Sequence, residues 1–478
     1  MNPERGLTLT RPTCAQCVKL QDEILRLRAE NKSLKDKLRY QQRQINEGYF
    51  GSSTPSAKKP FKANTHAERK NGGARNGHRG FGRATLALEQ ADEVIALDAT
   101  HDCPACRVRL ESLDTQTRTV MEVVPARVKK VVYQLTRRRC PCCRRVYAAK
   151  APGVLPKCQL GNSALAYLAT EHYLHQVTLG QLAERLRMPL GTLIQALHHL
   201  ARIFQDVPDR LIAEYRRALV KHADETSWRN DGRNGYAWIF CTPTIAIFRV
   251  RLTRAASVAQ EVFGEEALPG TLVVDRYAVY RNARCRMQYC YSHLLRLVQD
   301  LGKEFPEAGE VQDFVAAAAP LLAQAIKLRN LPITDEIFYL RADQLKSEIE
   351  HVMHNPACHA GVQKIQNIFR ENAPRLYQWA RDRTIPADNN LAERELRKLV
   401  IARKISFGSQ AEAGAKTRET LMTVLRTLQK RRPGEVRANV QACLDELVHA
   451  PQAEPFALLF APKRSACSPA QLPSCVHR

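Results

Sequence analysis

The stretch Gly270-Thr-Leu-Val-Val-Asp275-Arg-Tyr-Ala-Val-Tyr280 decides the fold that we expect for the chain. Its apolar run of Leu and Val residues after Gly270 indicates a buried strand, and Asp275 ends that run. A carboxylate at the end of a buried strand is costly unless it is paired or binds a metal ion. Because metal binding needs more than one acid, the sequence should hold further acids that can reach Asp275.

A second acid lies at the end of another apolar run. Residues 219–226 predict a strand that ends at Asp224. Between the two acids, the pattern predicts strands at 236–240 and 244–250 and a helix at 257–263 with Ser257 as its N-cap. The order strand, strand, strand, helix, strand puts Asp224 on the first strand and Asp275 on the fourth. If these two strands are neighbours in one sheet, their carboxylates converge at its edge.

The third candidate acid is Glu393, far downstream in the segment 386–397. Asp388 or Asn389 would cap a helix there, and Glu393 would lie in its early turns. Three carboxylates can hold two Mg²⁺ ions about 4 Å apart, which activate a water or a 3′-hydroxyl and stabilise the departing oxygen of a phosphodiester. If the register of the prediction is shifted, the alternative acids are Glu225, Asp231, Asp388 and Glu395.

Five short sequences resemble, in the same order, those of DDE transposases of the insertion sequence 66 family. They are His222-Ala-Asp224-Glu-Thr226, Val274-Asp275, Cys290-Tyr-Ser-His293, Asn389-Asn390-Leu-Ala-Glu393-Arg394 and Arg403-Lys-Ile-Ser-Phe-Gly408-Ser409. Each sequence alone is weak, but the ordered set is specific, and the resemblance covers most of the chain. It implies an α+β multidomain protein with a ribonuclease H-like α/β catalytic core and a helical insertion.

The resemblance also implies an enzyme that uses Mg²⁺ to cleave DNA at insertion-sequence ends and to transfer the freed strand into target DNA. Asp224, Asp275 and Glu393 would be the catalytic metal ligands, with Asp275 as the bridge between two ions, and Mn²⁺ would substitute for Mg²⁺. Two other hypotheses stay open. One is a catalytically inactive, sequence-specific DNA-binding protein, such as a repressor or a domesticated remnant, and the other is a metal-dependent nuclease without joining. A pure DNA-binding protein does not need the three acids, which favours the transposase.

One histidine and one arginine after the fourth strand are candidate DNA contacts. Residues 288–296 predict a fifth strand that runs into a helix, which carries His293 and Arg296. His293 would contact the scissile phosphate or a flanking strand, and a hydrogen-bonded core histidine is the alternative. A zinc site formed by His293 and Cys290 is a third interpretation, but it lacks further ligands nearby in the sequence.

Four more arginines are candidate DNA contacts. Arg394 and Arg397 would lie beside Glu393 on one helix, where they would hold DNA phosphates or pair with glutamates of the same helix. Arg75 and Arg79 belong to a basic, Gly-rich linker at 51–90 that cannot form regular structure readily. Such a linker would track phosphates or serve only as a solvated tether.

The N-terminal region carries a heptad repeat. Apolar residues at a and d positions between Leu20 and Ile45, with Asn31 at an a position and attractive e and g charges, predict a parallel coiled coil. It would join two protomers, or more, and the alternative is a single amphipathic helix packed on the protein. The role of the pair Cys14 and Cys17 is open between an incidental pair and a metal or redox site.

Two further cysteine pairs predict a structural zinc site in residues 91–152. Cys103, Cys106, Cys140 and Cys143 can supply four thiolates to a tetrahedral Zn²⁺, with Cys142 as a spare ligand. The stretch 117–136 between the pairs predicts two strands that would close the gap. The family resemblance implies a zinc finger here that binds DNA at the element ends.

Residues 153–216 predict helices, two of which have the form of a helix-turn-helix. Leu179, Leu182 and Leu186 form an apolar face, a break follows, and a second helix begins at Thr192. Plain helical packing is the alternative, since Gln195, His198 and His199 are the only polar options for reading bases. The expected organisation is 1–50 coiled coil, 51–90 linker, 91–152 zinc-binding domain, 153–216 helical segment, 217–299 first core part, 300–385 helical insertion, 386–450 second core part and 451–478 tail.

The net charge of +25 in 478 residues predicts a polyanionic partner, and nucleic acid is the usual one. The sequence shows no signal peptide and no apolar run that we expect to span a bilayer, so we expect a cytoplasmic, nucleoid-associated bacterial protein without a membrane partner. Its 15 cysteines are then thiols or metal ligands rather than disulfides. The resemblance adds small accessory proteins encoded by the same element as expected partners.

Overall fold

The computed structural model describes residues 23–35 and 38, the backbone of 137–139 and 146–148, and residues 152–460 apart from 157 and 159. The chain divides into two compact units, one formed by Met1–Pro60 with Tyr133–Arg478 and the other by Phe61–Val132. The second unit lies outside the described residues. So do other predicted features, which stay predictions: Cys14 and Cys17, Arg75 and Arg79 of the linker, and Cys103, Cys106, Cys140 and Cys143 of the zinc site.

Two short pieces of the N-terminal region are described. Residues 23–35 form a helix whose Ile24, Leu27 and Leu34 side chains are exposed, so this helix does not pack on other described residues through its predicted a and d positions. Strands β1 (Arg137–Arg139) and β2 (Val146–Ala148) pair antiparallel on either side of the segment that holds Cys140 and Cys143.

A five-stranded mixed sheet forms the centre of the larger unit. Its strands are β3 (Val220–Asn230), β4 (Arg233–Cys241), β5 (Ala246–Arg251), β6 (Thr271–Val274) and β7 (Arg286–Tyr289), in the order β5-β4-β3-β6-β7. Strands β3, β4 and β5 pair antiparallel, and β6 and β7 run parallel to β3. The strands that lead to Asp224 and Asp275 are neighbours in the sheet, which is the condition under which their carboxylates converge.

The prediction that the first strand ends at Asp224 is wrong, because β3 continues to Asn230. Its parallel pairing with β6 stops at His222, opposite Val273, whereas its antiparallel pairing with β4 continues to the hairpin turn. After His222, β3 is therefore no longer paired with β6 along the edge that faced it, whereas its other edge stays paired with β4. We call this part of the strand the released edge of β3. Asp224 lies in the released part, beside the end of β6.

Gly270 has a backbone reason to precede β6. Its φ is +74°, and a Cβ atom there would collide with the Leu219 carbonyl, which accepts a hydrogen bond from the Thr271 N–H at 2.8 Å. The helix before it, α6 (Ala256–Phe263), has Ala255 rather than Ser257 at its N-cap, so the predicted capping residue is wrong. Ser257 is instead the second residue of the helix.

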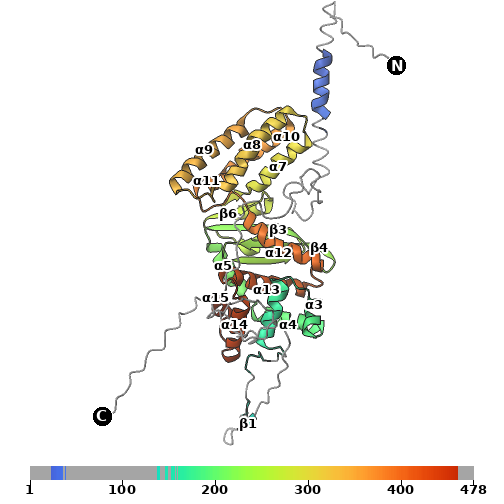
Figure 1. The fold of residues 1–478 in the computed structure, drawn as a ribbon, viewed down its shortest axis with the longest axis vertical. Coiled ribbons are helices and arrows are strands. Elements are labelled where there is room, and N and C mark those ends of the chain that lie inside the picture. Colours follow the sequence, from blue (N-terminus) through green and yellow to red (C-terminus); the bar gives the residue numbers. More distant parts are fainter. Residues whose placement is uncertain are drawn as a thin grey trace, which may run out of the picture. The chain divides into compact units, whose positions relative to one another are not determined.

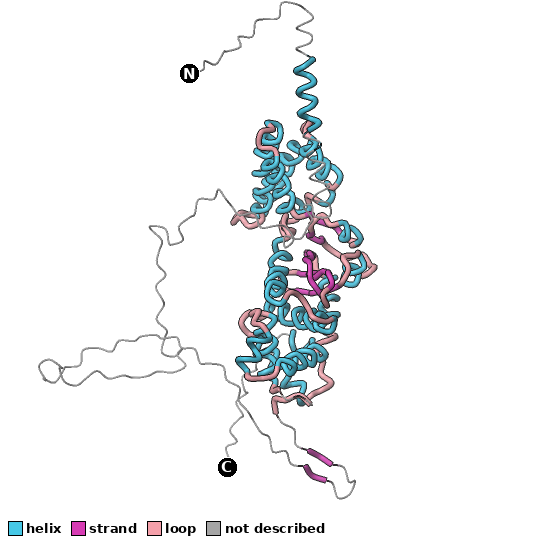
Figure 2. The backbone as a smooth tube through the Cα atoms, turned by 90° about the vertical axis from the view of Figure 1, so that its right-hand side faces the viewer, coloured by secondary structure: helices cyan, strands magenta, loops and turns pink. Residues whose placement is uncertain are grey.

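Helices lie on two sides of the sheet (Figure 1 and Figure 2). One group precedes the sheet in sequence: α2 (Asn162–Tyr173), α3 (Leu179–Leu186), α4 (Leu190–Ile203) and α5 (Val207–Arg217). The insertion comprises α7 (Tyr291–Glu304), α8 (Gly309–Leu328), α9 (Asp335–His354), α10 (Ala360–Glu371), η5 (Ala373–Arg375) and α11 (Gln378–Arg381), and the short helix η4 (Ala278–Asn282) follows β6. The chain closes with α12 (Asn390–Ser406), α13 (Glu412–Arg431), α14 (Val436–His449) and α15 (Pro455–Phe460).

Two helix predictions need correction. The second helix of the helix-turn-helix pattern begins at Leu190, two residues before Thr192, with Pro189 at its N-cap. The helix predicted to follow the fifth strand is confirmed as α7, which begins at Tyr291 and carries His293 and Arg296. The predicted tail contains α15, whose Leu459 is fully buried, so an ordered helix lies within 451–478.

Helix α8 is long and apolar enough to cross a membrane, with a mean hydropathy of 1.2, and among the described residues it alone passes that test. It nevertheless packs between α7 and α9 and buries Val311, Phe314 and Leu322. Such a buried face is typical of a core helix in a helical bundle.

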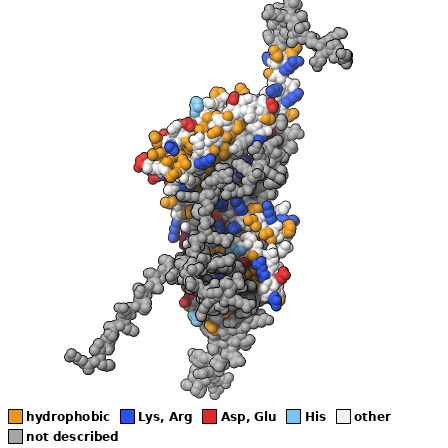
Figure 3. Space-filling view, viewed as in Figure 1, with side chains coloured by type: hydrophobic (Ala, Val, Ile, Leu, Met, Phe, Trp, Pro, Cys, Tyr) orange, Lys and Arg blue, Asp and Glu red, His pale blue; other side chains and the backbone are white. Residues whose placement is uncertain are grey.

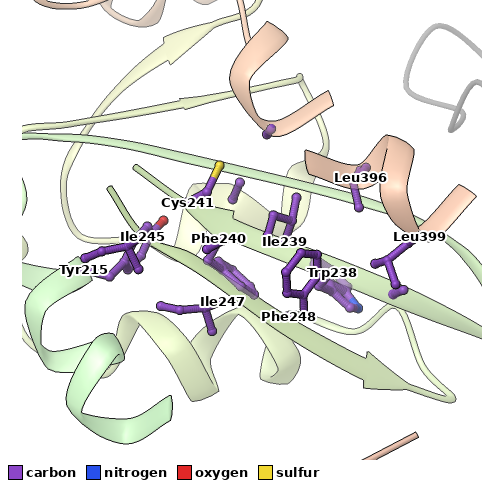
Figure 4. Packing of buried hydrophobic residues seen from close by; sticks show 14 of the residues in the cluster. Tyr215, Trp238, Ile239, Phe240, Cys241, Ile245, Ile247, Phe248, Leu396 and Leu399 are labelled. Atoms are coloured by element: carbon purple, nitrogen blue, oxygen red, sulfur yellow. The ribbon is translucent and has the colours of Figure 1, made fainter. Parts of the chain in front are cut away.

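Aromatic and aliphatic side chains fill the core around β4. The ring of Phe240 lies 6.2 Å from that of Tyr215 in α5 and 5.4 Å from that of Phe263 in α6. On α12, Leu396 and Leu399 are buried and point toward the sheet (Figure 4). Burial of this apolar surface holds α12, and with it Glu393, against the strands that carry the other acids.

Helix α13 covers the outer edge of the sheet. Three N–H groups of β5 donate to its side chains: Ala246 to Thr427 Oγ1 (3.1 Å), Phe248 to Thr423 Oγ1 (3.0 Å) and Val250 to Glu419 Oε1 (2.7 Å). The acceptors recur every four residues and so lie on one helix face, while the donors recur every two residues along one strand edge. An edge strand that would otherwise expose its donors is thereby satisfied.

Candidate active site

Three segments bring the predicted acids together. The pairing of His222 with Val273, continued by two residues on each strand, places Asp224 opposite Asp275 on the same side of the sheet. Glu393 lies in the first turn of α12, which packs on β3 and β4. Asp275 is buried, and Asp224 and Glu393 are half-buried.

The three carboxylates repel one another. Burial raises the pKa of Asp224 well above its usual range, and the negative charges of Glu225, Asp275 and Glu393 raise it further. Burial and the charge of Glu225 raise the pKa of Asp275 to about 7, against a hydrogen bond from the Tyr277 N–H. A divalent cation would relieve this repulsion, because it favours the ionised form of each ligand.

The chemistry of the donors fits a hard cation. Glu393 Oε1 is a buried oxygen without a hydrogen-bond partner among the described residues. Burial raises the pKa of Glu393, whereas the nearby cations Arg296 and Arg397 lower it. Oxygen ligands of this kind suit Mg²⁺ or Mn²⁺. The carboxylates of Asp224, Asp275 and Glu393 are therefore donors of the kind that such a cation prefers.

The four alternative acids have other surroundings. The Glu225 carboxylate accepts hydrogen bonds from Arg254 and Tyr280. Glu395 pairs with Arg426 at 2.7 Å and Lys430 at 2.9 Å. The other two alternatives lie outside the sheet, since Asp231 is exposed in the β3–β4 turn and Asp388 accepts from the Asn390 N–H at 3.0 Å.

Asn389 joins the segments of the site, which sequence reasoning had considered only as a helix cap. It occupies the N-cap position of α12, but its side chain bonds β3 instead: Oδ1 to His222 Nδ1 at 2.9 Å and Nδ2 to the Ala223 carbonyl at 2.9 Å. Its main-chain N–H donates to Cys290 Sγ at 3.2 Å. One buried residue thus holds the start of the Glu393 helix beside the Asp224 strand.

A cluster formed by Arg254, Glu225 and Tyr277 holds the loop after β6. The Arg254 guanidinium lies 3.8 Å from the centre of the Tyr277 ring and pairs with the buried Glu225 carboxylate. The Tyr277 hydroxyl donates to the Arg254 carbonyl at 2.8 Å, and the Tyr277 N–H donates to Asp275 Oδ1 at 2.9 Å. Sequence reasoning missed this cluster, and the adjacency of Glu225 to Asp224 was its only signal.

The structure places a further metal-ligating side chain, Glu393, beside Cys290 and His293, although the sequence around these two residues offers none. One ligand atom each from Cys290, His293 and Glu393 lies within 4.8 Å of the others, with His293 Nδ1 3.9 Å from Glu393 Oε1. Glu393 is distant from Cys290 and His293 in the sequence, and helix α12 brings it close to them. Burial, however, raises the pKa of the Cys290 thiol to about 12, and its sulfur already accepts the Asn389 N–H, which favours a structural role for Cys290.

The candidate DNA contacts among the described residues include three arginines near the acids and one histidine of the helix-turn-helix pattern. Arg296, Arg394 and Arg397 are exposed near the acids. The alternative that Arg394 or Arg397 pairs with Glu395 is not supported, because Arg426 and Lys430 of α13 occupy that carboxylate. His198 of the helix-turn-helix pattern instead bonds Thr417 Oγ1 of α13 at 2.6 Å. This contact favours helical packing over base reading for His198.

The sheet, the insertion and α12 lie within a region that matches a known protein family. The model of the transposase IS66 family matches residues 157–417, which is more than half of the chain. The chain belongs to the IS66 transposase family. The IS66 match contains the sheet, the insertion and α12, and therefore all three acids. Membership of this family indicates a DNA-processing protein.

A curated relative covers a similar share of the chain. The uncharacterized protein y4qI of Sinorhizobium fredii is 23% identical over 378 residues, and the match covers 71% of this IS66 family member and 69% of the relative. Its name assigns no activity, so the functional argument rests on the family and on the site.

Proposed function

We propose that the protein is a DDE transposase that cleaves DNA at the ends of its insertion sequence and joins the freed 3′-hydroxyls to target DNA. The observation that carries the proposal is the convergence of Asp224, Asp275 and Glu393 from three segments within the IS66 match. The strand order β5-β4-β3-β6-β7 supports a ribonuclease H-like core, in which the first and fourth strands lie side by side.

Each acid has a role that follows from its position. Asp224 and Asp275 would hold metal ions between the released edge of β3 and the end of β6, and Glu393 would complete the ligand set from α12. Two bound Mg²⁺ ions would supply activation of the attacking oxygen and stabilisation of the departing one. Arg296 and Arg397, whose charges act on Glu393, would hold DNA phosphates beside it.

Other parts of the proposal concern the assembled protein. We propose that the coiled coil joins protomers, that the zinc module and the linker bind DNA at the element ends, and that the protein acts in the cytoplasm on the element ends and the target. The exposed Ile24, Leu27 and Leu34 side chains support the first of these. Small accessory proteins remain proposed partners.

The first test is the substitution Asp275→Asn, with labelled DNA that carries the element's ends and with either Mg²⁺ or EDTA. We expect cleavage and joining to fall to background while DNA binding stays largely intact, because the variant loses a metal ligand and keeps the basic surface. Asp231→Asn in the exposed turn is the matched control and should keep wild-type activity.

The same assay separates the competing hypotheses. Wild-type cleavage without joined product would favour the nuclease, and binding without cleavage would favour the inactive DNA-binding protein, unless accessory proteins restored the reaction. Wild-type cleavage by Asp275→Asn would show that the acids are wrongly assigned.

A further inference from the structure

A basic hollow lies on the insertion side of the sheet, away from the three acids. Its volume is about 700 Å³, and its walls come from the η4–β7 segment, from α9 and from the η5–α11 segment. Glu350 is the one carboxylate of its lining, against six cations: Arg281, Arg284, Arg286, Lys346, Arg375 and Arg381. On the face drawn in Figure 3, Lys and Arg side chains lie along the margin between the insertion and the sheet.

Strand register separates this hollow from the acids. Arg286 pairs with Thr271 at the start of β6, whereas Tyr289 pairs with Val274 at its end, directly before Asp275. The three steps from Arg286 to Tyr289 span roughly 10 Å of strand. The hollow and the acids therefore lie at opposite ends of the same two parallel strands, close enough for one DNA molecule to reach both.

The charge of the hollow is largely uncompensated. Within the described part of the chain, Lys346 is the only one of the six cations in an ion pair, with Glu350 at 3.8 Å. Other arginines of the fold have carboxylate partners, such as Arg251 with Glu261 at 2.6 Å. Five guanidinium groups without such partners around one hollow repel one another, and a polyanion would relieve this repulsion.

The outer edge of β7 is covered in one half and open in the other. Near the C-terminal end of β7, Gln288 Nε2 donates to the Leu376 carbonyl at 3.0 Å, and the Trp379 N–H donates to Gln288 Oε1 at 3.1 Å. These bonds fasten the insertion to the strand. Arg286 and Met287 at the start of β7, together with residues 283–285 before it, line the hollow instead. The insertion thus forms a wall opposite the basic strand end.

We propose that this hollow binds the phosphate backbone of duplex DNA, independently of base sequence, as a second DNA site at the opposite end of β6 and β7 from the acids. The proposal rests on the proposed function, which supplies DNA as the substrate. Guanidinium groups match phosphate geometry through paired N–H donors, and backbone contacts position a duplex without reading its sequence. The site would hold the DNA that continues past the point of cleavage.

The test measures how binding depends on salt. The full chain with Arg281→Ala, Arg284→Ala and Arg286→Ala is titrated with a duplex of random sequence in EDTA at several salt concentrations. Each lost phosphate contact lowers the log–log salt slope by about 0.9, so we expect the slope to fall by about 2 to 3 and the affinity to fall about tenfold or more.

Two controls make the result specific. Lys327→Ala, Arg341→Ala and Arg370→Ala remove three exposed cations of the insertion that do not line the hollow, and should leave the slope unchanged. Replacing the three hollow arginines by Lys keeps the charge and should retain most of the slope. Circular-dichroism melting should show that all variants stay folded.

The outcomes also distinguish this proposal from the proposed function. A wild-type slope in the triple Ala variant would overturn the second DNA site, even if the protein cleaved and joined DNA normally. A reduced slope in a protein that never cleaves its element ends would support the second site and count against the transposase.

Discussion

Asn389 shows how a single amide can fix the geometry of a site. Its side chain bonds two residues of β3 that precede Asp224, and it begins the helix that carries Glu393 four residues later. The residue is fully buried, so each of these bonds lies in a medium where an unmade bond is costly. Asn389 thus ties the strand of Asp224 to the helix of Glu393 without being one of the three acids.

We expect Asn389→Ala to weaken metal binding about 10- to 100-fold, because supporting residues of this kind orient metal ligands. It should also lower the free energy of unfolding by about 1–3 kcal/mol, because His222 and the Ala223 carbonyl lose buried partners. Mg²⁺ titrations of DNA cleavage and urea unfolding measure the two effects. Asn390→Ala, one position along the helix, is the control, and equal Mg²⁺ requirements in both variants would contradict a positioning role for Asn389.

Sequence reasoning predicted the acids but missed the residues around them. Asp224 and Asp275 each follow an apolar run, a signal that is local in the sequence. The bond from His222 to Asn389 joins residues 167 positions apart, and the bond between Arg254 and Glu225 joins residues 29 positions apart. Such contacts depend on how the sheet and α12 meet, which no local pattern encodes.

At the scale of elements, the strands along the chain were predictable and element ends were less so. The apolar runs and the turns between them predicted five strands in the chain order that the structure has, whereas the sheet order β5-β4-β3-β6-β7 depends on pairing that the runs do not encode. The end of β3 was misplaced because its two edges part at different residues, and the position of α15 was missed because a six-residue helix has no repeating pattern of its own. Pairing and packing decide such ends.

Gly270 links two of these elements, so its substitution tests the junction of β3 and β6. We expect Gly270→Ala to lower the free energy of unfolding by about 1–3 kcal/mol or more, because its φ of +74° disfavours a side chain and the new Cβ would collide with the Leu219 carbonyl. Urea unfolding measures the change. Gly191→Ala on α4, where a Cβ meets nothing within 4 Å, is the control and should be neutral or stabilising. Equal stabilities of the two variants would refute this account of Gly270.

At the scale of the whole molecule, the exposed helix at 23–35 and the net charge of +25 suggest how protomers and DNA are brought together. The helix presents its predicted a and d residues to solvent within the part of the chain that is described. Exposed apolar side chains at heptad spacing are typical of a coiled-coil seam that awaits a partner.

We expect the full chain to be at least a dimer, and Leu27→Asp with Leu34→Asp to make it monomeric. Each aspartate would put a charge into the apolar contact between the two helices, which disfavours association more than the remaining apolar contacts favour it. Light scattering coupled to size-exclusion chromatography measures the mass. Leu25→Asp is a matched control, since Leu25 is equally apolar and exposed but lies at a b position. A dimeric double variant would locate the contact between protomers elsewhere.

The covering of β5 by α13 has a practical consequence for shortened forms of the protein. A fragment limited to residues 157–417 would retain every acid of the site but lose most of α13, including Glu419, Thr423 and Thr427. The sheet would then present a bare row of amide donors, which invites strand-to-strand stacking between molecules. Such a fragment should precipitate, even though the segment matching the family is complete, so soluble fragments need to extend at least through residue 431.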